Sequence, residues 1–364
     1  MQILIIAFIV ALALTLMIVR SAKQHSHLSH DHDVSGPQKF HATPVPRVGG
    51  LGIFLGILSA GAFLFWSQPA IGRLMLLLLG CALPAFVSGI AEDITKNVSP
   101  SRRLLFTAIS AVIAFFLVDG RVGRVGTEFL DVTTLPVAAC ILTVFAVAGV
   151  TNAVNIIDGF NGLASMCIVL MMSATAYVAF QVGDSAVLSM CLACIGAVLG
   201  FFVWNFPAGL IFLGDGGAYF LGFMVAELSL MLLWRNPTVS PLFPLLTCVY
   251  PIFETVFSIY RKKVIRGMSP GVPDGVHLHM LVYKRLMRWM VGRRDAKALT
   301  QRNSLTSPYL WVLCMSAVIP AVLFWRNTAI LGLFIVLFAF GYVFLYWRIV
   351  RFKAPKWLVT RSTK

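Results

Sequence analysis

The chain has 364 residues, 59% of them hydrophobic, with a mean hydropathy of +0.87. Soluble domains contain about 45–50% apolar residues, so the composition excludes a soluble protein and predicts an all-α integral membrane protein, with residues 1–364 forming one polytopic domain. The net charge of +15 requires no nucleic acid, because a basic face toward anionic lipid and a phosphate-bearing substrate explain it as well. The seven cysteines lie in apolar runs and predict no disulfides.

Hydrophobic runs predict about eleven transmembrane helices. The first, residues 2–19, is long enough to span a hydrocarbon core and has no basic segment before it. We therefore expect a retained helix and not a cleaved signal peptide. The predicted spans are 2–19, 48–66, 72–91, 103–118, 134–150, 162–181, 186–204, 218–234, 240–260, 308–325 and 329–350.

Lysine and arginine lie mostly on one side of this layout. With the N-terminus outside, 24 of the 29 basic residues fall on one side and five on the other. The loops 20–47, 96–103 and 261–306 carry four, three and eleven of the 24, and the C-terminal end carries six. The positive-inside rule then predicts a periplasmic N-terminus and a cytoplasmic C-terminus, with the loops 20–47 and 261–306 and the basic tail 351–364 in the cytoplasm.

A polar stripe follows the fifth predicted span, within residues 151–165. Asn152, Asn155, Asp158 and Asn161 recur there at a spacing of three, so the first three share a helix face. A structural cap needs one or two polar residues, not four. Amides and a carboxylate that face one cleft suit sugar hydroxyls, a base edge or a metal.

Two acidic segments predict the same chemistry and face the same side. Glu92 and Asp93 lie at the end of the third span, where a magnesium-linked or phosphate-positioning role competes with a solvated helix end. Asp215 lies between glycines at the start of the eighth span. It suits Mg²⁺, which prefers one or two carboxylates plus substrate phosphates, or it caps the following helix.

Basic and imidazole groups complete the pattern. Lys39, His41 and Arg47 precede the second span and are donors suited to phosphate, although basic residues there often serve as topology signals. His277 and His279 lie in the loop 261–306, near its eleven basic residues. The histidines between residues 25 and 32 are better explained as a solvated loop than as a metal site.

These motifs together resemble the polyprenyl-phosphate N-acetylhexosamine-1-phosphate transferase family (glycosyltransferase family 4), in particular its undecaprenyl-phosphate GlcNAc-1-phosphate transferase-like members. The family also includes the peptidoglycan translocase. The resemblance runs from about residue 38 to 286, in order: KFHATPVPRVGG, the acidic pair, NAVNIIDGFNGLAS, FLGDGGAYFLGF and the histidine-containing loop.

The resemblance implies a reaction on the cytoplasmic face of the bacterial inner membrane. The phosphate of a polyprenyl (undecaprenyl) carrier attacks the β-phosphorus of a UDP-sugar, UMP leaves, and a lipid-linked cell-envelope glycan begins. Mg²⁺, with Mn²⁺ as an alternative, offsets the charge of the diphosphate. The partners implied are the UDP-sugar, the lipid carrier and membrane lipids, with no nucleic acid; whether the chain forms a homodimer stays open.

The resemblance also implies roles for individual residues. Asp215 corresponds to the metal ligand, with Glu92 as a second metal-linked acid, and Asp93 readies or positions the lipid phosphate. Phosphate or sugar is held by His277 and His279. The residues that would line the nucleotide-sugar pocket are Asp158, Asn152, Asn155 and Asn161, with the loop donors Lys39, His41 and Arg47.

Three positions depart from the family's pattern. The acidic pair begins with Glu92 instead of aspartate, Asn161 replaces an aspartate, and the histidine motif reads HLHM. The last two favour a UDP-N-acetylhexosamine over the UDP-muramoyl peptide of the peptidoglycan enzyme, phospho-MurNAc-pentapeptide transferase, which stays an alternative. A proton- or ion-coupled transporter is the other alternative. It would have inverted repeats and midplane acids, whereas we see no repeat and the key acids cluster at one face.

Overall fold

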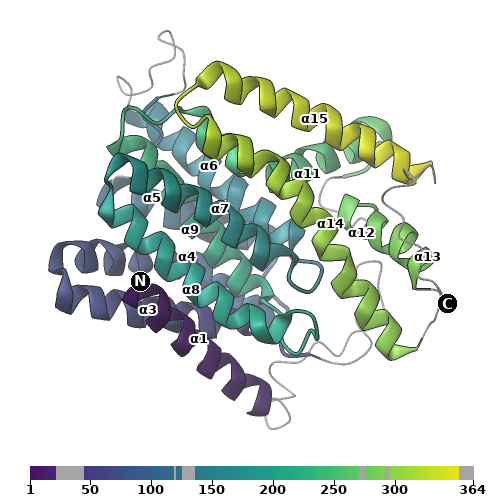
Figure 1. The fold of residues 1–364 in the computed structure, drawn as a ribbon, viewed down its shortest axis with the longest axis horizontal. Helices are drawn as coiled ribbons and strands as arrows, with labels where there is room; N and C mark the ends of the chain where they lie inside the picture. The colour runs from purple at the N-terminus through teal and green to yellow at the C-terminus, as the bar shows by residue number, and fades with distance from the viewer. Residues whose placement is uncertain (22–44, 119, 125–135, 270–274, 292–294, 352–364) are drawn as a thin grey trace.

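The computed structural model describes residues 1–21, 45–118, 120–124, 136–269, 275–291 and 295–351, and this part of the chain is helical, with no β-strand. Ten of its helices are long and apolar enough to cross a membrane. They lie side by side as a bundle (Figure 1). Their bounds are α1 (Gln2–Ser21), α3 (Gly49–Ser67), α4 (Pro69–Thr95), α5 (Pro100–Leu117), α6 (Pro136–Ile157), α7 (Leu163–Val182), α8 (Ser185–Asn205), α9 (Gly214–Arg235), α14 (Ala296–Leu323) and α15 (Thr328–Val350).

The ninth predicted span, 240–260, is two short helices, α10 (Leu242–Thr247) and α11 (Val249–Tyr260). Neither is long enough alone to count among the ten. The break at Cys248 has a local cause, because Pro251 has no N–H for the carbonyl of Thr247 and its ring crowds that carbonyl. Within the described residues, the prediction of about eleven spans therefore corresponds to ten long helices and one segment made of two short helices.

The polar stretch 261–306 is largely ordered where the structure describes it. After α11 come η3 (Arg261–Ile265), a π-helical turn, and then α12 (Leu278–Leu281), η4 (Val282–Met287) and α13 (Arg288–Met290). Helix α14 begins at Ala296, well before the predicted start at 308, and its first turns bury Arg302 and Asn303. This segment is thus part of the packed protein.

Helix α9 is the centre of the bundle. Every residue of its membrane-length window is buried, and it packs against α3, α4, α6 and α7. Glu227 on this helix is fully buried, and neither of its carboxylate oxygens has a hydrogen-bond partner within the described chain. Because α9 is enclosed on all sides, a site at its first turn has walls made by several other helices.

Contacts between helix ends show which ends of α8, α9, α10 and α15 lie together. At one end of the bundle, Asp184 before α8 binds Arg235 at the end of α9, with 2.9 Å between Oδ2 and Nε. At the same end, the hydroxyls of Ser240 and Thr328 lie 2.8 Å apart. The starts of α10 and α15 therefore lie together, and α10 and α11 jointly traverse the bundle. The opposite end gathers the polar residues that follow.

Candidate active site

The first turn of α9 is built around two carboxylates. Gly214 has a φ of +76°, in the left-handed region that glycine adopts most readily, and Asp215 follows it. The carboxylate of Asp93, from the end of α4, accepts from the backbone N–H groups of Asp215 and Gly216 at 2.9 Å each. Asp93 is only 2% exposed. It satisfies two otherwise orphaned donors of the helix and fixes where Asp215 lies.

The segment before α3 is bound to the residues before α9. The N–H groups of Gly49 and Gly50 donate to the carbonyls of Phe212 and Leu213 at 3.0 Å each. A Cβ on Gly50 would lie 2.4 Å from the backbone nitrogen of Gly217, so only glycine permits this approach. As a result, the Arg47 guanidinium lies 3.8 Å from both Asp93 Oδ1 and Asp215 Oδ1.

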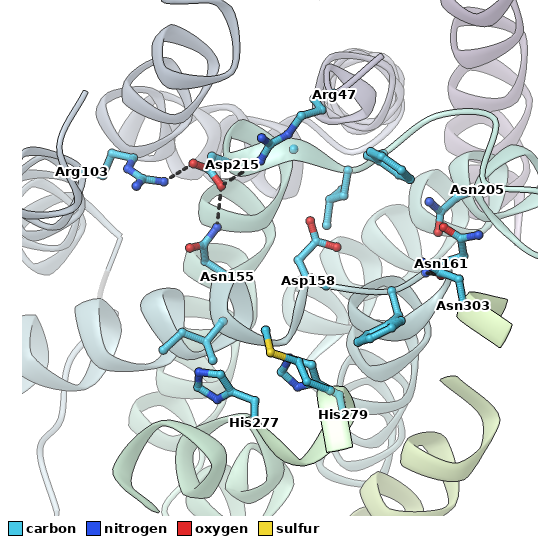
Figure 2. Close-up of a pocket in the computed structure, with 17 residues that line it drawn as sticks. Arg47, Arg103, Asn155, Asp158, Asn161, Asn205, Asp215, His277, His279 and Asn303 are labelled. Carbon is cyan, nitrogen blue, oxygen red and sulfur yellow. Dashed lines mark hydrogen bonds and ion pairs between the residues drawn. The ribbon is translucent and has the colours of Figure 1, made fainter. Parts of the chain in front are cut away.

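The carboxylate of Asp215 has two further partners (Figure 2). Arg103, from the first turn of α5, donates to Oδ2. Asn155, near the end of α6, donates from Nδ2 to Oδ1 at 2.9 Å. The Arg103 guanidinium also lies over the ring of Tyr219, 5.5 Å from its centroid. With Arg47, side chains from three other segments thus converge on one carboxylate.

Asp158 lies in the turn between α6 and α7 and points into the same space (Figure 2). Its carboxylate forms no hydrogen bond or ion pair with the residues that the structure describes. Burial raises the pKa of Asp158 to about 7, helped by the carboxylates of Asp215 and Asp93 and opposed by Arg47. A carboxyl group poised near neutral pH gains charge when a cation approaches.

The two histidines have different surroundings. His277 Nδ1 lies 3.0 Å from Glu254 Oε1. His279 is fully buried, stacks on His277 with ring centroids 5.3 Å apart, and has no hydrogen-bond partner for either ring nitrogen within the described chain. Burial lowers the pKa of His279 to about 3, with His277 lowering it further and Glu254 opposing the shift. His279 is therefore neutral at physiological pH.

Amides form the remaining wall, where α14 meets the turn after α6. The side chain of Asn303 accepts from the N–H of Asn161 at 2.8 Å, and that of Asn205 accepts from Gly162 at 2.6 Å. The Asn161 amide donates to the carbonyl of Pro207 and the hydroxyl of Ser304, both at 3.3 Å. The wall is polar but carries no charge.

These groups surround a cavity of about 370 Å³. One side is charged, with Arg47, Arg103, Asp158 and Asp215, and the others are imidazole and amide. Such a site can hold an anionic diphosphate at one side and a neutral polar ligand group at the other. The lining residues are Arg47, Arg103, Asn155, Ile156, Asp158, Gly159, Phe160, Asn161, Asn205, Phe212, Leu213, Gly214, Asp215, His277, His279, Met280 and Asn303.

Most of the predicted site residues meet at this cavity, but not all. Glu92 and Asn152 do not line it, and the Glu92 carboxylate accepts instead from the N–H of Val98 at 2.7 Å. Asp93 does not line the cavity either, because its carboxylate binds the backbone N–H groups of Asp215 and Gly216 at the first turn of α9. The two remaining predicted residues, Lys39 and His41, and the histidines between 25 and 32 lie outside the described residues.

Sequence reasoning missed Arg103, Asn205 and Asn303. Arg103 was counted only as a topology signal, although it shares an end of the bundle with Asp215. A polar residue at the last position of a span, followed by Phe206 and Pro207, was the available signal for Asn205. Asn303 lies in the polar stretch 261–306, where a polar residue does not stand out from its neighbours, so no sequence signal was available for it.

The donor set fits a hard divalent cation. Within the described ranges, no three or more His, Cys, Asp or Glu side chains gather closely enough to bind a metal ion by themselves. Asp158 and Asp215 nevertheless face one cavity, and Mg²⁺ is usually bound by one or two carboxylates with substrate phosphates and waters completing its shell.

Comparison with known proteins adds an independent line of support. The sequence profile of glycosyl transferase family 4 matches residues 75–233. A probable undecaprenyl-phosphate N-acetylglucosaminyl 1-phosphate transferase from Bacillus subtilis is 30% identical over 297 residues, covering 80% of this chain and 79% of its own. Phospho-N-acetylmuramoyl-pentapeptide-transferases from two Streptococcus pneumoniae strains, CGSP14 and 70585, are 31% and 33% identical over 64% of this chain and 73% of theirs.

Proposed function

Because this chain belongs to glycosyl transferase family 4, we propose that it transfers a sugar 1-phosphate, from a UDP-N-acetylhexosamine, to a polyprenyl phosphate. The observation that carries the proposal is the cavity at the first turn of α9, where two arginines and two carboxylates meet amide and imidazole side chains. Undecaprenyl phosphate is the proposed carrier, and the product starts a lipid-linked glycan of the cell envelope.

In the proposed reaction an oxygen of the lipid phosphate bonds to the β-phosphorus of the UDP-sugar, and the bond from that phosphorus to the bridging oxygen breaks. UMP leaves with the bridging oxygen and its electron pair. Arg47 and Arg103 line the cavity where they can bind phosphate oxygens bidentately. The amide wall of Asn161, Asn205 and Asn303 faces the uncharged parts of the nucleotide sugar.

The carboxylates have different proposed tasks. Asp215 and Asp158 would hold Mg²⁺, which when bound offsets the diphosphate charge. Asp93 keeps Asp215 in place through the two backbone hydrogen bonds. The contact of Glu92 with Val98 supports a position beside the site and not in it.

The proposed orientation places the cavity on the cytoplasmic face of the bacterial inner membrane, with the N-terminus in the periplasm and residues 1–364 as one membrane domain. The 24-to-5 division of lysine and arginine supports this orientation. The positions of two arginines are compatible with it, because Arg103 lies at the cavity end of the bundle and Arg235 at the other.

The test is transfer by the purified protein. Detergent-solubilised protein, undecaprenyl phosphate and Mg²⁺ are incubated with each of a panel of UDP-sugars that includes UDP-MurNAc-pentapeptide, and UMP release is measured. We expect release with an N-acetylhexosamine donor and little with the muramoyl peptide. Release only with the muramoyl peptide would identify the peptidoglycan reaction instead, and no release with any donor would refute the transferase proposal.

A further inference from the structure

Glu254 on α11 is a buried carboxylate with every oxygen engaged. It is 1% exposed. Oε1 lies 3.0 Å from His277 Nδ1 and accepts from the backbone N–H of Leu278, also at 3.0 Å. The hydroxyl of Tyr342, on α15, donates to Oε2 at 2.7 Å. Three donors from two other segments thus converge on one side chain of the broken span.

This arrangement determines which nitrogen of His277 is available to a ligand. An ionised carboxylate can only accept, so the proton of the 3.0 Å contact belongs to Nδ1. Nε2 is then the nitrogen left for the cavity that His277 lines. The Leu278 contact fixes the backbone next to the imidazole, and the parallel ring of His279 limits its tilt.

We propose that Glu254 is a positioning residue, which holds His277 so that Nε2 meets a phosphate oxygen of the nucleotide in the cavity. This inference rests on the proposed function for the identity of the ligand. Two negative groups then flank the imidazole, the carboxylate at Nδ1 and the phosphate at Nε2, and each ring nitrogen donates one hydrogen bond.

A purely structural explanation of Glu254 makes a different prediction. The carboxylate also joins α11 to α15 through Tyr342, so its removal could loosen the bundle without acting through His277. A double-mutant cycle separates the two explanations, because losses through a shared partner are not additive, whereas independent losses multiply as fold-changes.

The cycle uses the affinity for UMP, measured by calorimetry on the full-length protein with Mg²⁺. The variants are Glu254→Gln, His277→Ala and the double variant. We expect each single change to weaken UMP binding about 10- to 100-fold, the range found for partners that orient metal-binding histidines. We expect the double variant to bind UMP as His277→Ala does. A double variant whose loss is the product of the two single losses would overturn the proposal, as would unchanged affinity in His277→Ala.

Glu227→Gln is the matched control, since Glu227 is equally buried but lies in α9 and has no hydrogen-bond partner in the described chain; it should keep normal UMP affinity. Where Glu254→Gln lowers the melting temperature, the cycle is run with Glu254→Asp, which retains the charge but shortens the reach to His277. Transfer is measured in parallel. UMP binding with the expected cycle but no transfer would refute the proposed function and leave the inference standing.

Discussion

Replacement of Asp93 by asparagine is the sharpest test of how the first turn of α9 is held. The carboxylate accepts two backbone N–H groups, from Asp215 and Gly216, at 2.9 Å each, and Asp93 is 2% exposed. In Asp93→Asn one of these oxygens becomes an NH₂ group, which cannot accept. One buried N–H then loses its acceptor and faces another donor.

The expected size follows from that loss. A hydrogen bond to a charged acceptor contributes about 1.5–3 kcal/mol, and each 1.4 kcal/mol is tenfold in an equilibrium constant. The equilibrium constant for the arrangement that presents Asp215 to the cavity should therefore fall about 10- to 150-fold, and transfer should fall by up to the same factor. Glu92→Gln is the matched variant. It should lose less than about threefold, because an amide oxygen can still accept from Val98.

The assay compares initial rates of UMP release by the two purified variants, after their melting temperatures have been compared with that of the unmodified protein. A large loss in Asp93→Asn with near-normal Glu92→Gln is the expected result. Equal large losses in both variants would refute the reasoning, because they would mean that the acidic pair acts as a unit.

Three further predictions concern the metal, the pH and the topology. Chelation should abolish transfer, and Asp215→Asn should lower it by about 10²-fold or more; a normal rate and normal Mg²⁺ dependence in that variant would contradict the assignment. Burial raises the pKa of Asp158 to about 7, so below pH 7 Mg²⁺ must displace a proton from this carboxyl group. The affinity for Mg²⁺, measured by calorimetry, should therefore rise with pH up to about 7 and then stay constant. The variant Asp158→Asn should lose this pH dependence. Single-cysteine reporters at Asn97 and Arg326, in a variant without the native cysteines, should be labelled from the cytoplasm and the periplasm, respectively; the reverse pattern would refute the orientation.

The sequence predicted much of this architecture because a helix that crosses a hydrocarbon core needs about 20 mostly apolar residues, and such runs can be read from the sequence, even for the buried helix α9. The polar stripe after α6 and the FLGDGGA segment were also recognisable, and Asp158, Asn155 and Asp215 do meet at one cavity. The burial of Asp93 was not predictable, because it depends on how the end of α4 meets the start of α9, a tertiary contact that no local pattern records. Hydropathy also missed the first turns of α14, where polar Asn303 and Ser304 pack against the turn after α6.

The departure of Asn161 from the family's aspartate has a structural explanation in this chain. Its amide nitrogen donates to the carbonyl of Pro207 and to the hydroxyl of Ser304. A carboxylate has no such donor when ionised, and its oxygen would lie against the carbonyl oxygen of Pro207. The asparagine therefore matches its neighbours on α14 and the segment after α8, whichever sugar the cavity holds. For this reason the donor panel, and not the identity of residue 161, decides between the N-acetylhexosamine and the muramoyl peptide.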